Sequence, residues 1–130
     1  MKQQEIFNHA SYHLMNMEGP SLDQDGDACV YRGKDEGGEF NGQKCVIGLF
    51  MEDEHYDEDL EGQSIDNSPA VVYAVAQSWG CTGLSNKQLR LLYDLQIAHD
   101  HRFNNCENWS AKVASALKRI ARKHQLEFNA

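Results

Sequence analysis

The sequence lacks any run of about 18 apolar residues, the length that a membrane-spanning helix requires, so no membrane contact is predicted. Its first residues, 1–5, are polar and lack the apolar core of a signal peptide, so we expect a cytoplasmic protein with reduced cysteines. No C-x-x-C pair occurs, which is the usual spacing of zinc and redox sites. We therefore expect buried thiols that pack as small hydrophobic residues at Cys29, Cys45, Cys81 and Cys106.

Proline and basic residues are also scarce. Only two prolines occur among 130 residues, of which 41% are hydrophobic, and this composition excludes a disordered chain. Twelve Lys and Arg against twenty Asp and Glu give a net charge of −8, which argues against a general nucleic-acid binder. The charge is uneven, because residues 18–66 hold fifteen acidic and three basic residues. The rest of the chain holds five acidic and nine basic residues.

Apolar spacing predicts four main helices, at about residues 3–17, 69–79, 86–101 and 107–124. Ser68 and Ser85 are predicted N-caps, and Gly80 ends the second helix. Apolar residues from Leu89 to Ala98, Ile97 among them, cover more than half of the third helix and predict that it is central. The last helix has a basic outer face made of Lys112, Lys118, Arg119, Arg122 and Lys123.

Between the first two predicted helices the apolar runs are short and show no helical periodicity. Apolar runs at 28–32 and 43–47 predict a β-hairpin whose second arm passes into a short helix. One or two helical turns are predicted near 54–60. The expected fold class is mainly α with a small β-hairpin (α+β), as a single compact domain of about four main helices over residues 1–130.

Alternating carboxylates at Asp23, Asp25 and Asp27 are typical of a calcium loop. That alignment puts Ala28 in place of the required glycine and Lys34 in place of the bidentate glutamate. The segment is therefore predicted to be a solvated turn.

Two groups could carry enzyme chemistry. His99-Asp100-His101 could bind a divalent metal, although spacing identifies no further ligand, and histidines in a last helical turn also interact well with the helix dipole. Cys45, at the start of the predicted short helix, could be a nucleophile with a lowered pKa, with His55, His99 or His101 as its base. Its apolar neighbours favour simple packing. We favour a structural role for both groups and predict no metal and no cofactor.

Residues 52–66 hold eight carboxylates and no basic residue. Such a run is either a solvated face or an interaction surface, where spaced carboxylates imitate a phosphate backbone and dock on a basic protein. The residues predicted to bind a partner are Asp53, Glu54, His55, Tyr56, Asp57, Glu58, Asp59 and Glu61. The basic face of the last helix is expected to pair with this run, within the molecule or across a dimer.

Several short motifs follow one another along the chain. They are Cys29-Val30-Tyr31-Arg32-Gly33, Lys44-Cys45-Val46-Ile47-Gly48-Leu49, Asp53-Glu54-x-Tyr56, Glu61-Gly62, Leu95-Gln96-x-x-His99-Asp100 and Trp109. In this order the chain resembles, over about residues 3–126, a group of small, functionally uncharacterised proteins of tailed phages and prophages. The loop with residues 36–40 is longer here than in that group. The resemblance implies a phage origin and a shared fold, but no reaction.

Three classes of function remain. The first is a small acidic phage accessory protein that binds a host or phage protein with a basic surface through residues 52–66, and so inhibits, for example, a host defence or a host enzyme. The second is a homo-oligomeric structural or assembly component. The third is a small metal- or thiol-dependent hydrolase built on His99 and Asp100 or on Cys45. We favour the first and lean against an enzyme.

Overall fold

The computed structural model describes residues 1–100 and 108–128. Four long helices and one short helix lie in these residues: α1 (Gln3–Met15), α2 (Val46–Leu49), α3 (Pro69–Ser78), α4 (Asn86–His99) and α5 (Trp109–Lys123). The strands β1 (Arg32–Lys34) and β2 (Phe40–Lys44) form an antiparallel hairpin. Two 3-10 turns, η1 (Asp53–His55) and η2 (Glu58–Leu60), follow α2. The predicted mainly α fold with a small hairpin is confirmed.

The helix starts form as the sequence predicts. The Ser68 hydroxyl accepts a hydrogen bond from the Val71 N–H (3.3 Å), and Pro69 opens α3. Ser85 and Gln88 form a capping box at the start of α4, with hydrogen bonds of 3.1 and 2.8 Å. Gly80 follows α3 with a positive φ of 71°, which is the left-handed conformation expected of a glycine at a helix end.

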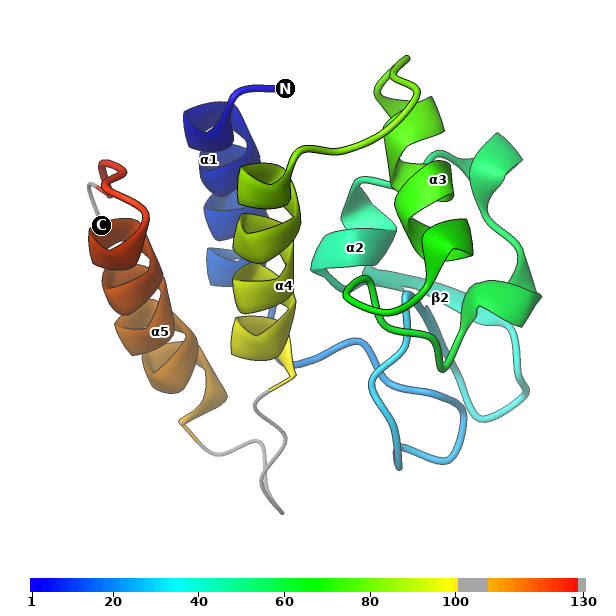
Figure 1. Ribbon diagram of the computed structural model, residues 1–130. Helices are drawn as coiled ribbons and strands as arrows, with labels where there is room; N and C mark the ends of the chain where they lie inside the picture. Colours follow the sequence, from blue (N-terminus) through cyan, green and yellow to red (C-terminus); the bar gives the residue numbers. More distant parts are fainter. Residues whose placement is uncertain (101–107, 129–130) are drawn as a thin grey trace.

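Helix α4 is central, as predicted, because it packs against α1, α5 and α2 (Figure 1). Helices α1, α4 and α5 lie side by side, and the hairpin, α2, α3 and the 3-10 turns lie on the other side of α4 (Figure 1). Large buried side chains from both parts join one hydrophobic cluster, among them Phe7, Ile47, Leu92 and Trp109. Within the described residues, no helix is both long and apolar enough to cross a lipid bilayer.

The hairpin differs from its predicted position. Its first strand starts at Arg32 rather than at residue 28, because Cys29 instead pairs with Leu22 in an isolated bridge. Its second strand ends at Lys44, because Cys45 is already the N-cap of α2. Inside the Leu22–Cys29 bridge, the Asp23 carboxylate accepts the Asp27 N–H (2.9 Å), so the predicted exposed turn is present.

Only part of the cysteine prediction is correct. Cys45 is fully buried, whereas Cys29 and Cys81 are half-buried near the ends of short connections. Cys106 lies outside the described residues.

At Gly48 the backbone of α2 lies against the backbone of Tyr31, the residue before β1. A Cβ built on Gly48 would lie 2.1 Å from the backbone oxygen of Tyr31, which is far inside van der Waals contact. The motif glycine is therefore required by packing, because no side chain fits between these two backbones.

Substituting Gly48→Ala is expected to lower the free energy of unfolding by about 3 kcal/mol or more, because the hairpin must move away from α2. Urea denaturation followed by circular dichroism measures this. Gly19→Ala is the matched control, since a Cβ there meets nothing within 4 Å, and it should change stability by less than about 0.5 kcal/mol. Equal stability of the two variants would contradict the close approach.

Candidate functional site

The motif residues of the hairpin and of the acidic segment meet around Arg32. Its guanidinium lies 4.3 Å from the centre of the Tyr56 ring and 5.6 Å from that of Phe40. Nη1 lies 2.6 Å from the Asp53 carboxylate, and Nη2 donates to the Met51 carbonyl at 3.3 Å. Only 11% of the Arg32 side chain is exposed, so this cation is held between rings and not presented to solvent.

Glu61 holds this arrangement from the other side. One carboxylate oxygen accepts the Tyr31 N–H at 2.8 Å, and the other accepts the Arg32 N–H at 3.2 Å and the Tyr56 hydroxyl at 2.8 Å. The Tyr31 hydroxyl donates to the carbonyl of Gln63. Burial, together with this hydrogen bond to Glu61, raises the pKa of Tyr56 well above its ordinary value. Tyr56 and Glu61 therefore fasten the acidic segment to the hairpin.

The remaining predicted partner-binding residues lie on the outside of the two 3-10 turns. We use the name acidic edge for five of them and the neighbouring Glu52, which is not among the predicted residues; all six are exposed: Glu52, Asp53, Glu54, Asp57, Glu58 and Asp59. Arg32 pairs with Asp53, and Lys34 pairs with Glu58 at 3.0 Å. The other four carboxylates have no Lys or Arg partner within the described part of the chain. His55 is half-buried, with Nε2 3.5 Å from Glu54.

The segment that carries the acidic edge and helix α5 lie on opposite sides of the molecule (Figure 1). Helix α5 packs on α1 and α4, whereas η1 packs on α3. Of the two pairings that the sequence left open, pairing within one molecule is therefore wrong, and pairing across a dimer stays a prediction. Arg32 and Lys34 on β1 are the cations that contact the acidic edge, because the hairpin and not α5 lies beside it.

His99 and Asp100 form a second polar cluster at the end of α4. His99 is fully buried, and its Nε2 accepts the Ser21 N–H at 2.9 Å, so the proton of the neutral ring is on Nδ1. Nδ1 lies 2.7 Å from the Asp100 carboxylate and donates to it. Gln96 donates to the same carboxylate (2.8 Å) and accepts the Ile47 N–H (3.0 Å). His101 lies outside the described residues.

Ligand atoms of Cys29, His99 and Asp100 lie within 4.8 Å of one another, a spacing that a metal ion could use. A metal on Nδ1 would leave the ring proton on Nε2, where it would face the Ser21 N–H, so two donors would oppose each other. The tautomer therefore favours the structural role of His99. The Trp109 indole N–H also donates to the His99 carbonyl at 3.1 Å, which ties α5 to the end of α4.

Cys45 does not have the environment of a reactive thiol. Its side chain is fully buried, and its sulfur accepts the Gly48 N–H at 3.4 Å as the N-cap of α2. Burial raises the pKa of Cys45 well above its ordinary value, which is opposite to the lowering that a nucleophile needs. The alternative of a reactive Cys45 with a lowered pKa is therefore contradicted, and the favoured packing role is confirmed, because α2 is one turn long and its residues 46–48 are buried in the core.

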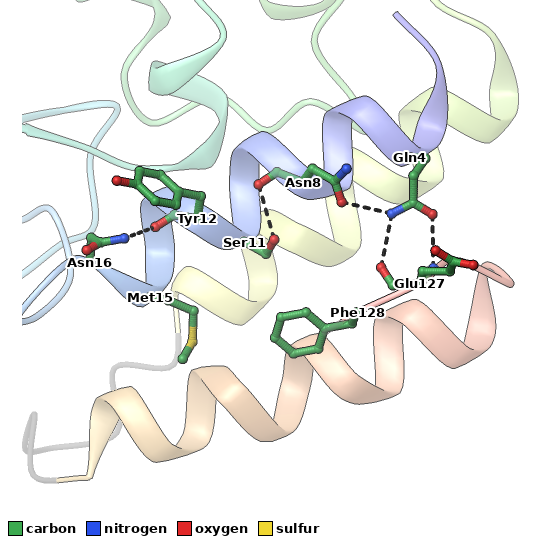
Figure 2. A pocket seen from close by; sticks show the side chains of 8 residues that line it. All are labelled: Gln4, Asn8, Ser11, Tyr12, Met15, Asn16, Glu127 and Phe128. Carbon is green, nitrogen blue, oxygen red and sulfur yellow. Dashed lines mark hydrogen bonds between the residues drawn. The ribbon is translucent and has the colours of Figure 1, made fainter. Parts of the chain in front are cut away.

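Sequence reasoning did not find the groove between α1 and the C-terminal segment (Figure 2). The Gln4 amide accepts the Glu127 N–H (2.9 Å) and donates to the Glu127 carbonyl (3.0 Å). Phe128 packs edge-on against Phe7, with ring centres 5.4 Å apart. Met15 projects into the space between α1 and α5 (Figure 2). The groove has a volume of about 480 Å³, and Glu127 is the one acidic or basic residue among the described residues that line it, so no chemistry is assigned to it.

Comparison with models of known protein families, with curated proteins and with solved structures finds no match to this chain.

Substituting Glu61→Gln is expected to lower the free energy of unfolding by about 2 kcal/mol. The NH₂ group of the glutamine would face N–H or O–H groups that now donate hydrogen bonds to the Glu61 carboxylate. Thermal and urea denaturation measure the loss. Glu58→Gln is the control, since this side chain is 75% exposed, and it should cost less than about 0.5 kcal/mol. If both variants cost the same, Glu61 does not hold the segment.

The thiol of Cys45 is expected to react with a maleimide at least about 100-fold more slowly than that of Cys81 in the native protein, because the reagent reaches Cys45 only after local unfolding. Mass spectrometry of peptides from a labelling time course measures the two rates. Labelling in denaturant is the control, and there the rates should converge. Rapid native labelling of Cys45 would restore the thiol-enzyme hypothesis.

Proposed function

We propose that this chain is a small phage-type accessory protein that acts in the host cytoplasm by binding the basic surface of another protein. The acidic edge is the proposed contact. The resemblance to phage proteins supports the origin, and the arrangement of the acidic edge supports the mode of action. Inhibition of the bound host protein is the proposed outcome.

The observation that supports this proposal is that the segment carrying the acidic edge is ordered by hydrogen bonds and by core contacts. The Glu61 and Tyr56 hydrogen bonds fasten the segment to the hairpin, and Leu60 and Ile65 anchor it in the core. A surface that is already ordered loses little conformational entropy on binding. The four carboxylates without a Lys or Arg partner leave a strong negative field, which speeds and orients association with a cationic partner.

The proposal predicts salt-sensitive capture of a basic protein that depends on the acidic edge. The test variant replaces Glu52, Glu54, Asp57 and Asp59 by their amides, which removes four charges and keeps Arg32–Asp53 and Lys34–Glu58 intact. Capture from a bacterial host lysate, quantified by mass spectrometry, is expected to fall at least about tenfold in this variant. Raising the salt from about 50 to about 500 mM should have the same effect.

The matched control removes four exposed charges elsewhere, through Glu18→Gln, Asp25→Asn, Glu36→Gln and Glu39→Gln. It should capture the same protein as the unmodified chain. Equal capture by the acidic-edge variant and the control would overturn the proposal, and so would the recovery of no partner at low salt. A chain that sediments as an oligomer, and becomes monomeric in the acidic-edge variant, would support the assembly function instead, since opposite charges on opposite sides suit head-to-tail contacts.

A further inference from the structure

A second surface, the groove between α4 and α5, lies away from the acidic edge. It has a volume of about 400 Å³, and its apolar floor consists of Ile97, Ala98, Ala116 and Ile120. Ile97 is 44% exposed, whereas each of the other four isoleucines is at most 8% exposed. Tyr93 lies one turn earlier on α4 and is 37% exposed. The sequence pattern places Ile97 in the apolar set of the central helix, yet α5 leaves it uncovered.

The rim of this groove is basic. Arg119 and Lys123 line it, and helix α5 carries five basic residues and no acidic residue. Asp94 also lines the groove, but its carboxylate oxygen Oδ2 lies 2.9 Å from Lys123 Nζ and 2.8 Å from His124 Nε2. Burial opposes the charge of Asp94, yet the hydrogen bonds from His124 and Lys123 hold its pKa below the ordinary value. The rim therefore remains positive on a protein whose net charge is −8.

We propose that the α4–α5 groove binds an acidic amphipathic helix of another protein. A helix can lay apolar side chains at i, i+3, i+4 and i+7 into an apolar groove between two helices. Carboxylates on the side of that apolar stripe that faces α5 would then meet Arg119 and Lys123, while the Asp94 carboxylate on α4 is already paired with Lys123 and His124.

Other occupants fit this groove less well. Single-stranded nucleic acid binds through aromatic side chains that stack on bases, and none of the described residues that line the groove is aromatic. Two copies of the chain joined through this groove would oppose their basic rims. The acidic edge of a second copy fits the apolar floor less well, because Leu60 is buried and the Tyr56 hydroxyl is bound to Glu61, so neither side chain of that segment is free to enter the groove. This second site does not depend on the proposed function, since it uses the other side of the molecule.

The test uses a fluorescent synthetic peptide of about 18 residues, long enough for several helical turns, with leucines at helical spacing and glutamates elsewhere. A second peptide has the same composition in scrambled order, and a third probe is single-stranded DNA of similar charge. Fluorescence anisotropy with the full chain is expected to give a Kd on the order of 10 µM for the first peptide. The scrambled peptide should bind at least about tenfold more weakly, because its leucines share no face.

Two variants locate the binding. Ile97→Gln removes the apolar contact and Arg119→Glu reverses a rim charge, and each is expected to weaken binding about tenfold or more. Tyr73→Gln, at a 60% exposed tyrosine on α3, and Lys2→Glu are the matched controls and should leave binding unchanged. Circular dichroism checks that all four variants are folded.

Several outcomes would overturn the proposal. The first is that neither peptide binds. The second is equal binding of the two peptides, which would reduce the interaction to charge alone. DNA that binds more tightly than the peptide, regardless of Ile97, would assign the basic face to nucleic acid. A dimer that Ile97→Gln dissociates would assign the groove to a second copy of the chain.

Discussion

The carboxylate of Glu61 is the constraint on which one half of the structure depends. It accepts two successive backbone N–H groups at the start of β1 and the hydroxyl of Tyr56, so the hairpin and the acidic segment cannot separate without leaving donors unmatched. The position of β1 then brings Arg32 between two rings and beside Asp53. Because the Tyr31 carbonyl is fixed in the same place, only glycine is accommodated at position 48 of α2.

The other half depends on a chain of hydrogen bonds at the end of α4. Gln96 joins α2 to Asp100, Asp100 orients His99, and His99 receives the Ser21 N–H and the Trp109 indole. These are the residue types from which metal sites and nucleophilic sites are built. Here their hydrogen-bonding capacity is used to join α2, α4, α5 and the segment after α1. The motif residues Gln96, His99 and Asp100 therefore serve packing, whereas the motif residues Asp53 and Glu54 are exposed on the surface.

On the surface, charge is separated by the way in which the helices pack. Helix α5 is amphipathic, so burial of Trp109, Val113 and Leu117 against α1 and α4 turns its cations outward on one side. The acidic edge is turned outward on the opposite side, because Leu60 and Ile65 anchor that segment in the core (Figure 1). Two surfaces of opposite sign therefore face different directions, which suits a protein that contacts more than one partner surface.

The amino-acid sequence alone determined the helices, their caps and the order of the charged segments, because these depend on local spacing and on neighbouring residues. The short hairpin was displaced from its predicted position, since apolar runs near Cys29 and Cys45 fit a strand, a bridge or a cap equally well. Only tertiary structure decided that Tyr56 and Glu61 serve the fold, that Cys29 and Cys81 are only half-buried and that Ile97 is exposed. Each of these depends on which distant segment covers the residue, and local sequence does not encode that.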